Sequence, residues 1–482
     1  MLSSAASELS YVCRTYRNTH SRFSLANSNL PMNKQELRAA LAIGLLYIIR
    51  MLGLFMILPV LPVVGAQLDL ATPLLVGLAL GVYGLTQAIL QIPMGLLSDR
   101  YGRKPIILTG LIMFILGSVL AANAESIYGI IAGRLLQGCG AISSSLLALL
   151  ADVTRIDQRA KAMAIVGISI AASFGLALVA GPLLLVETGL SGVFVFSAAT
   201  GVLGIIVLYT MIPAPRLAVR SPETSLKPER LRDITRNPDL QKMIMGVFML
   251  HFLLMSGFQV FPHLFVGTGE IQVSDHAMVY FSLLLVTFIL MGPFMWLADK
   301  PAYTKRMLLV MIAVFGVAQL LFANVVSLYP VLAGMVLFFM AFNLLEVIMP
   351  TLLSRSSPAG ARGTAMGVYS TAQFAGAFAG GAIGGLLLSS GDISHLLYFN
   401  ALACAVWFLL SVRLKKTGNL ASKVVHLNRN QYLSANEVAD ALLSVSGVID
   451  VVYLEAEQVA YLKVDKDRLD ENALTELEQG AA

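Results

Sequence analysis

The sequence predicts an all-α membrane protein with twelve transmembrane helices in two six-helix bundles, followed by a small α+β domain. The first observation is composition: 57% of the 482 residues are hydrophobic and only 13% are charged, with a mean hydropathy of +0.78. These values lie outside the range of soluble globular proteins. The second observation is that the apolar residues form long runs, and the third is a hydrophilic segment at 420–482 with a different pattern.

The apolar runs are long enough to cross a membrane as helices. A helix needs about 20 apolar residues for this, because unpaired backbone groups are not tolerated in lipid. Twelve segments of the chain meet the requirement. They are expected at residues 40–65, 72–97, 105–123, 127–151, 160–186, 191–212, 240–266, 276–298, 306–323, 327–354, 362–389 and 394–413.

The segment before the first span, residues 1–37, is a polar extension rich in Ser and Arg. It lacks the apolar core of a secretory signal. An organelle transit peptide would share this composition, but Met32 begins a polar lead-in that would serve as a complete start, so we expect an extension without a function of its own. The spans then form bundles at 38–212 and 240–413, joined by a proline-containing linker at 213–239.

The distribution of basic residues predicts the orientation in the membrane. Linkers 98–104, 152–161 and 300–306 each contain three Lys or Arg residues. The linkers on the opposite side have none; they are marked by Asp69, Glu125, Glu187, Glu270, Asp275, Asn324 and Asp392. Because Lys and Arg accumulate on the cytoplasmic side, both termini are expected in the cytoplasm, with the protein a multi-pass component of the cell inner membrane.

The two halves of the chain also resemble each other. The segment PMGLLSDR at 93–100 aligns with PFMWLADK at 293–300, and SIYGIIAG at 126 aligns with SLYPVLAG at 327. RAKAM at 159 and RGTAM at 362 repeat the relation. Three matches in register indicate an internal duplication, which is the arrangement of transporters built from two parallel six-helix repeats.

Two motifs then identify a family resemblance. GLLSDRYGRK at 95–104 resembles the signature G-x-L-a-D-r-x-G-r-k, which lies between helices 2 and 3 of the major facilitator superfamily. The matching residues are Gly95, Leu97, Asp99, Arg100, Gly102, Arg103 and Lys104. GRLLQGCGA at 133–141 is similar to the helix 4 motif of the same family, through Arg134, Gln137, Gly138, Gly140 and Ala141. The helix 5 antiporter motif is only partly present. Gly181 and Pro182 match it, but leucines replace the two glycines expected after the proline.

A closer resemblance, to YajR-type transporters, covers the chain from about residue 32 to its end. It is carried by RMLGLFMILPVLP in helix 1, GVYGLTQAILQIP in helix 2, AFNLLEVIMPTLLSRSSPAGARGTAMGVYSTAQF and the cytoplasmic tail. This resemblance implies proton-driven efflux and an appended small domain.

The signature between helices 2 and 3 suggests a conformational lock. Asp99 is an acid on the cytoplasmic face, where the two halves meet when the inner side closes. The positive end of helix 11, which begins after SSPAGARG on the same face, attracts a carboxylate. We expect Asp99, with Arg103 as its local partner, to stabilise the outward-open state, as the resemblance also implies. Arg100, Arg103 and Lys104 can instead be explained as topology markers, although this explains neither the acid nor Gly95 and Gly102.

Three charged residues inside the spans are candidates for transport or proton coupling. A charge at the centre of the bilayer costs roughly 2.5 to 3.5 kcal/mol, so such residues face a wet cavity or a partner. Arg50 is expected in the first turns of helix 1, where it either functions or extends to the cytoplasmic surface. Arg134 is expected two turns into helix 4. Glu346 is the only carboxylate deep in a predicted span, and it either loads and releases protons or forms a fixed structural pair.

Several uncharged polar residues are candidates for lining a cavity. Gln87 and Gln91 lie four apart on one face of helix 2. His251, Gln259, Asn343 and Gln373 are further candidates, although each is also explained by a hydrogen bond between helices. The 21 methionines would suit an apolar substrate site.

The tail at 420–482 predicts a ferredoxin-like domain. KVVHLN, VIDVVYLE and VAYLKVD alternate as strands, SANEVADALLSV has helical spacing behind a Ser cap, and a final helix is expected at 467–478. The order βαββα is that of a ferredoxin-like domain without its fourth strand. The segment SVSGVIDVVYLEAEQVAYLKVD resembles copper-carrying domains, but the loop before the first helix has no cysteine, so no metal is expected. A docking module on the cytoplasmic face is favoured over a ligand sensor.

The function that follows is secondary active transport by alternating access, with proton-coupled efflux of small amphipathic compounds. The expected partners are lipids, a small-molecule substrate and protons, with no cofactor, no nucleic acid and a monomeric state. An enzyme is not expected, because a Walker loop and a nucleophile elbow are lacking and Cys13, Cys139 and Cys404 are scattered. A nutrient importer and a membrane-anchored sensor that signals through its tail remain alternatives.

Overall fold

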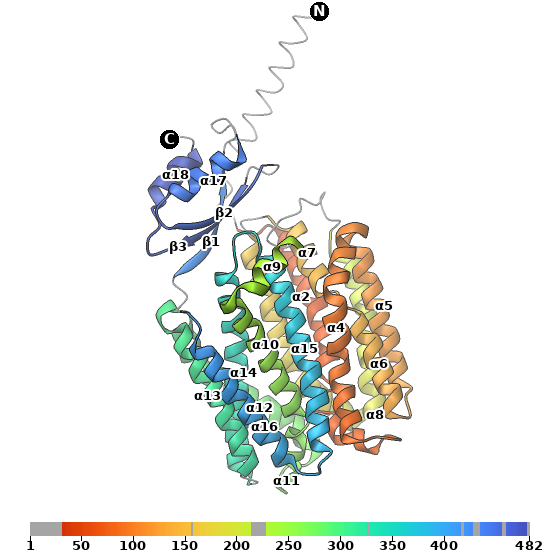
Figure 1. Ribbon diagram of the computed structural model, residues 1–482. Coiled ribbons are helices and arrows are strands. Elements are labelled where there is room, and N and C mark those ends of the chain that lie inside the picture. Colours follow the sequence, from red (N-terminus) through yellow and green to blue (C-terminus); the bar gives the residue numbers. More distant parts are fainter. Residues whose placement is uncertain are drawn as a thin grey trace, which may run out of the picture.

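The computed structural model describes residues 31–155, 158–213, 228–324, 327–415, 419–427, 434–455 and 459–479. Figure 1 shows a bundle of long helices with a small sheet domain at one end, so the predicted fold class is confirmed. We call the end of the bundle that carries this domain the tail end, and the opposite end the far end. Most of the polar extension and residues 214–227 of the predicted linker lie outside the described residues.

The N-terminal half differs from expectation where a span is interrupted. Its helices are α2 (Lys34–Phe55), α3 (Leu61–Val64), α4 (Pro73–Tyr101), α5 (Arg103–Ala122), α6 (Ile127–Cys139), α7 (Ser143–Val153) and α8 (Arg159–Thr210), with a 3-10 turn η1 (Gly65–Gln67) after α3. The first span, expected at 40–65, begins at Lys34 and ends at Phe55, because Pro59 lacks the N–H that would continue the helix. The fourth span, expected at 127–151, is broken into α6 and α7 between Cys139 and Ser143.

The long element α8 contains two of the expected spans. Its backbone leaves the helical region at Gly189, where φ is +69° and ψ is −174°, a conformation that glycine adopts without strain. Both of its ends lie beside the start of α2: Arg38 donates a hydrogen bond to the carbonyl of Thr210, and Arg155, just before α8, pairs with Glu36. The chain therefore turns back at Gly189. The described residues contain eleven helical segments long and apolar enough to span a membrane. One of them lies in α8, which turns back at Gly189 and therefore crosses twice, so the number of spans is twelve.

The C-terminal half contains the other six spans and one helix that was not expected. Its elements are α9 (Pro228–Arg236), α10 (Pro238–Phe258), α11 (Phe261–Gly267), η3 (Val273–Asp275), α12 (His276–Ala298), α13 (Pro301–Asn324), α14 (Leu328–Ser356), α15 (Arg362–Leu388) and α16 (Ile393–Val412). Helix α9 lies inside the predicted linker and packs against α10 and α15. The seventh span divides into α10 and α11.

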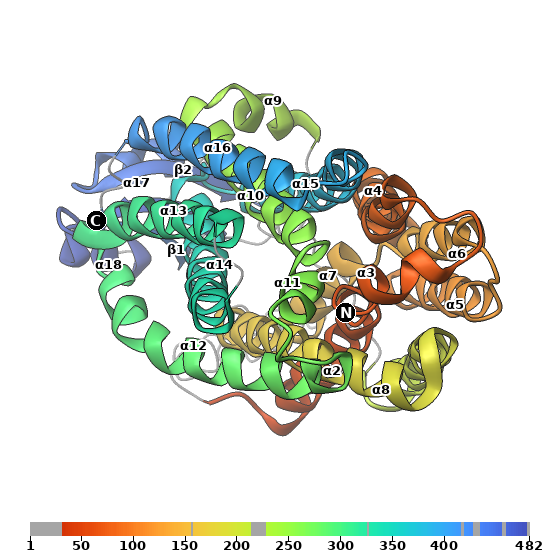
Figure 2. The same ribbon diagram turned by 90° about the horizontal axis from the view of Figure 1, so that it is seen from below.

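The two halves meet along α4 and α15, which lie side by side in Figure 2. Glycines on α4 allow this contact. A Cβ at Gly81 would lie 2.8 Å from the carbonyl oxygen of Phe378, and one at Gly84 would lie 2.6 Å from that of Phe374. At Gly77 a Cβ would overlap the carbonyl oxygen of Gly381. Backbone therefore touches backbone along the part of α4 that is nearer the far end; we call this contact the glycine seam.

The tail domain follows the predicted order. It contains β1 (Leu420–His426), α17 (Ala435–Ser444), β2 (Val448–Leu454), β3 (Val459–Asp465) and α18 (Glu471–Gln479), and its antiparallel sheet has the order β1-β3-β2. Ser434 and Glu437 form the capping box that starts α17. The domain has its own hydrophobic core, separate from that of the bundle, built around Val425, Leu442, Leu462 and Leu474.

The tail domain docks on the loop between α14 and α15. The Asp450 carboxylate accepts a 2.8 Å hydrogen bond from the backbone N–H of Ala359, and the Lys463 ammonium group donates one of 2.8 Å to the carbonyl of Ser356. Val452 packs against Gly360 between them. Burial lowers the pKa of the Lys463 ammonium group, as expected for a contact that is partly withdrawn from water. These contacts favour the docking interpretation of the tail.

Deleting residues 420–482 should leave a folded, membrane-inserted bundle. The domain has a separate core, and its two docking hydrogen bonds, each of which involves a charged group, contribute about 1.5 to 3 kcal/mol each. The measurement is gel filtration in mild detergent, with the full-length Asp450→Asn, Lys463→Gln variant as a control that keeps the domain but removes the contacts. Aggregation of the truncated protein would show that the tail belongs to the folding unit of the bundle.

Candidate functional site

Three polar side chains from three helices meet in the C-terminal half. They are Glu346 on α14, His251 on α10 and Gln373 on α15. The amide nitrogen of Gln373 lies 2.8 Å from Nε2 of His251 and 3.4 Å from Oε1 of Glu346. Nε2 of His251 lies 3.8 Å from Oε2 of Glu346. The sequence singled out each residue separately, and the structure brings them together; we call them the Glu346 cluster.

The hydrogen bonds of the cluster assign the protonation of the imidazole. Nδ1 of His251 lies 3.2 Å from the carbonyl oxygen of Val247, which can only accept, so Nδ1 carries a proton. Nε2 of the neutral ring then accepts from the Gln373 amide, whose second N–H points to Glu346. A proton added at Nε2 of His251 would break the hydrogen bond from Gln373, and the new N–H of the imidazole would point toward the Glu346 carboxylate. The cluster therefore has two neighbouring groups that can take up a proton.

The surroundings of the cluster are mixed. His251 is buried and packs edge-on against Phe342, whereas one third of the Glu346 side chain, 33%, is exposed. Among the described residues, Oε2 of Glu346, the amide nitrogen of Asn343 and the Tyr369 hydroxyl are buried without a hydrogen-bond partner. Unpaired buried polar atoms are costly, so a proton, water or substrate that bonds to them is stabilised here.

An aromatic layer lies on the far side of the cluster. Phe174 of α8 packs against Phe342 with ring centres 5.5 Å apart, against Phe339 at 6.3 Å and against Phe258 at 6.4 Å. Since Phe174 comes from the N-terminal half and the other three from the C-terminal half, the layer joins the halves. Together with the glycine seam it packs the halves together toward the far end, and the Glu346 cluster lies on the tail side of this layer.

Arg134 is where the sequence predicted it, two turns into α6, and its side chain is fully buried. Nε donates to the carbonyl of Ala79 at 3.3 Å, and Nη1 donates to the carbonyl of Gly53 at 3.2 Å. Nη1 also bonds the Gln137 side chain, and the guanidinium lies over the Tyr83 ring. These neutral partners tie α6 to α2 and α4, and they explain how the charge is tolerated.

The expected position of Arg50 in the first turns of its helix is wrong, and so is the alternative in which its side chain extends to the surface. Helix α2 begins at Lys34, so Arg50 lies about 24 Å along the axis, in the last third of the 22-residue helix. Its side chain is only 2% exposed, and Nη1 donates to the Ser143 hydroxyl at 2.8 Å. The helix starts early because Asn33 and Glu36 form a capping box.

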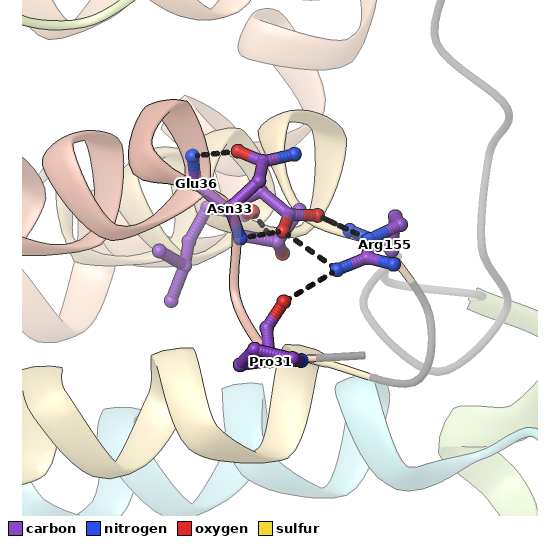
Figure 3. Close-up of polar contacts among 6 residues, drawn as sticks. Pro31, Asn33, Glu36 and Arg155 are labelled. Carbon is purple, nitrogen blue, oxygen red and sulfur yellow. Dashed lines mark hydrogen bonds and ion pairs between the residues drawn. The ribbon is translucent and has the colours of Figure 1, made fainter. Parts of the chain in front are cut away.

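Sequence reasoning missed an ion pair between Glu36 and Arg155, which Figure 3 shows. Nε of Arg155 donates to Oε1 of Glu36 at 2.9 Å, and its Nη2 donates to Oε2 at 3.1 Å and to the carbonyl of Pro31 at 3.2 Å. The pair fastens the start of α2 to the end of α7 at the tail end. The spacing of Asn33 and Glu36 was the signal that could have shown that the helix begins before residue 38.

The signature motif forms a second polar cluster at the tail end. Asp99 pairs with Arg103, which also bonds Oδ2 of Asp152 at 3.1 Å and the Ser98 hydroxyl at 2.8 Å. The sequence anticipated Arg103 as the partner of Asp99 but did not include Asp152. Gly102 has a φ of +97°, which favours glycine at the turn into α5.

The other residues of the motif have separate contacts. Gly95 is buried and its carbonyl accepts from Ser98, Arg100 lies over the ring of Tyr101, and Lys104 donates to the carbonyl of Ile212. The lock role itself stays a prediction, because in this structure the halves pack together along the other part of α4.

The remaining candidates are distributed over several helix contacts. Gln87 is buried and its amide bonds the Tyr83 hydroxyl, and Gln91 is buried one turn further along α4. Gln259 on α10 donates to the carbonyls of Gly380 and Gly381 on α15. This is a hydrogen bond between helices, which was the alternative to a role in lining a cavity. Of the partial antiporter motif, Pro182 lies inside α8, and Gly181 lets α8 touch the carbonyl of Met56 where α2 ends.

Comparisons with known proteins agree with this architecture. The family model described as Major Facilitator Superfamily matches residues 43–300 and 267–425. The chain is 38% identical to the inner membrane transport protein YajR of Escherichia coli, over 90% of this chain and 95% of that protein. It is 25% identical to multidrug resistance protein 1 of Bacillus subtilis, over 81% and 99% of the two chains. The crystal structure of a bacterial homologue of the human lysosomal transporter Spinster, inward-facing and occupied, matches with a TM-score of 0.65 at 15% identity, over 80% of this chain and 98% of that one.

Proposed function

Because this chain belongs to the major facilitator superfamily of membrane transporters, we propose that it is a proton-driven efflux transporter of small amphipathic compounds. The observation that carries this proposal is the Glu346 cluster, in which a carboxyl group and an imidazole inside the bundle are bridged by one amide. A carboxyl group in such a place can exist with or without its proton, and the change in charge alters what else the site binds.

In this proposal the cluster is exposed alternately to the two sides of the membrane. With the tail end in the cytoplasm, as the basic linkers predict, packing of the halves toward the far end gives an inward-facing state. A proton that binds to the cluster from the far side would dissociate from Glu346 to the cytoplasmic side. Substrate then binds from the cytoplasmic side, and the return to the far side carries the substrate outward.

Two further observations favour efflux over nutrient import. Multidrug resistance protein 1, which aligns over nearly its whole length, is named for resistance to drugs. The cluster is bordered by the aromatic rings of Phe342 and Phe174, which suit an apolar substrate. A sugar importer would be expected to offer more hydrogen-bonding groups.

The test is a reconstituted-vesicle assay with a pH-sensitive dye trapped inside. A proton gradient is imposed, and a panel of amphipathic compounds is screened for uptake coupled to proton movement. Coupled movement of any of them supports the proposal. If no compound and no proton moves, while deletion of the tail changes a cellular response, the sensor alternative is favoured; the docking of the tail on the loop between α14 and α15 is the observation that speaks for it.

Asp99→Asn should move the population toward the inward-facing state and lower transport about 2- to 10-fold. Asp99 lies about four turns beyond Gly84 on α4, at the end that must close in the outward-facing state. A carboxylate at the N-terminus of α15 contributes about 0.3 to 1 kcal/mol, or more when partly buried, which an amide does not supply. Spin-label distances across the tail end measure the shift, and identical distributions in Asp99→Asn and wild type would leave the motif as a topology signal.

A further inference from the structure

The Arg50 guanidinium is the less satisfied of the two buried arginines in the N-terminal half. Arg134 has three hydrogen-bond acceptors and an aromatic ring around it, although its Nη2 is also buried with no partner among the described residues. Arg50 has one hydrogen bond, from Nη1 to the Ser143 hydroxyl, and its Nη2 is buried with no partner among the described residues. Each Nη carries two N–H donors, so both N–H groups of Nη2 of Arg50 are left without an acceptor.

Arg50 also has no counter-charge in the part of the chain that the structure describes. The ion pairs of the N-terminal half there join Arg103 with Asp99 and Asp152, and Arg155 with Glu36. All lie at the tail end, whereas Arg50 lies in the last third of α2, away from that end. An arginine cannot lose its charge by deprotonation, and an unpaired charge in a membrane interior costs several kcal/mol. Arg134 also lacks a carboxylate, but neutral acceptors and the Tyr83 ring surround it, whereas Arg50 has a single acceptor and is therefore the better candidate to bind an anion from outside the chain.

Polar groups of two other helices lie beside Arg50. On α7, Ser143 accepts from Arg50, its carbonyl accepts from the Tyr47 hydroxyl at 2.7 Å, and the next residue, Ser144, donates to the carbonyl of Gln91 on α4. The side-chain oxygen of Gln91 is itself buried without a partner among the described residues. A carboxamide can present either its oxygen or its N–H groups, so Gln91 can also turn a donor toward an anion.

We propose that Arg50 binds the carboxylate group of the transported compound, so that the preferred substrates are amphipathic carboxylates. The unpartnered Nη2 of one guanidinium, next to hydroxyl and amide groups, fits one negative charge on a planar group. This proposal rests on the proposed efflux function and narrows its substrate class. It also divides the roles between the halves, because Arg50 holds the substrate and the Glu346 cluster holds the proton.

The experiment measures binding to purified full-length protein in detergent. The probes are benzoate and 1-naphthoate, each paired with its neutral amide, benzamide or 1-naphthamide, which keeps the ring and removes the charge. The carboxylates should raise the thermal unfolding midpoint in a concentration-dependent way, and the amides should not. Arg50→Gln should weaken carboxylate binding by about 30-fold or more, because removing one partner of a buried charge pair costs at least about 2 kcal/mol. Arg50→Lys should keep part of the affinity, and Arg306→Gln, at an arginine on α13 of the other half, should keep all of it.

Three outcomes would overturn the proposal: no carboxylate stabilises the wild type, the Arg50→Gln variant binds them equally well, or sodium chloride alone gives the same stabilisation, which would indicate an inorganic anion. If the Arg50 variants do not fold, the comparison of acid, amide and chloride on the wild type still decides. Glu346→Gln separates this proposal from the proposed function, because it should still bind the carboxylates. Carboxylate binding by a wild-type protein that shows no proton-coupled transport would support the anion site and reject the proposed coupling.

Discussion

Glu346→Gln should abolish proton-driven transport and leave the protein folded. Glutamine keeps the size of the side chain and can still bond Gln373, but it has no proton to exchange. In vesicles with an imposed proton gradient, uphill accumulation of a substrate should fall to the level of empty vesicles. Downhill exchange of the same substrate should continue and should no longer depend on pH, because the step that couples the two movements is lost while the path remains.

The matched control for this experiment is Asp299→Asn. Asp299 is also in the C-terminal half, but its side chain is exposed at the tail end, where it forms one long ion pair of 3.9 Å with Arg355. Removing its charge should change neither the rate nor the pH dependence of transport. Gel filtration of both variants checks that they are folded. If Glu346→Gln keeps the pH dependence of the wild type, Glu346 has no role in coupling, and His251 would be the next residue to replace.

The overall architecture could be predicted because it depends on properties that are local in the sequence. Twelve apolar runs separated by charged linkers give twelve spans, and alternation in the tail gives three strands. The strand expected at VAYLKVD coincides with β3, Val459–Asp465. The apolar runs do not show where a helix is interrupted within a span. The breaks after Phe55 and Cys139 fall inside continuous hydrophobic segments, where composition gives a membrane span and only proline or glycine geometry ends the helix.

The Glu346 cluster shows where sequence reasoning stops. Polar residues in a span are rare, so His251, Glu346 and Gln373 could each be recognised as unusual. Which of them touch depends on how α10, α14 and α15 are rotated and tilted against one another, and that is set by packing far from the polar residues. The pairing of Arg50 with Ser143 and of Arg103 with Asp152 was missed for the same reason, since the partners lie on different helices.

Gly381→Leu should trap the transporter with its far end open and lower transport by about 5- to 150-fold. At Gly381 a Cβ would lie 2.5 Å from the carbonyl oxygen of Gly77 and 2.8 Å from the backbone nitrogen of Gly81. Backbone atoms cannot rotate away as a side chain can, so the two helices must separate. Overpacking of this kind costs roughly 1 to 3 kcal/mol, which corresponds to the stated range of rates. The cost applies only to the state in which the glycine seam is closed, so folding of each half should be little affected.

The seam and the proton site can be separated by measuring the far end directly. Spin labels at Leu70 and Ser390, both exposed beside the ends of α4 and α15, should move to longer distances in Gly381→Leu, after the native cysteines are replaced. Gly292→Leu on α12 is the matched control, because a side chain there meets no atom within 4 Å and should change neither distance nor rate. A Gly381→Leu protein with wild-type distances and transport would mean that this close approach is not part of the transport cycle. A protein that opens at the far end and still exchanges protons at Glu346 would show that closing the seam is required for moving the substrate but not for loading the proton.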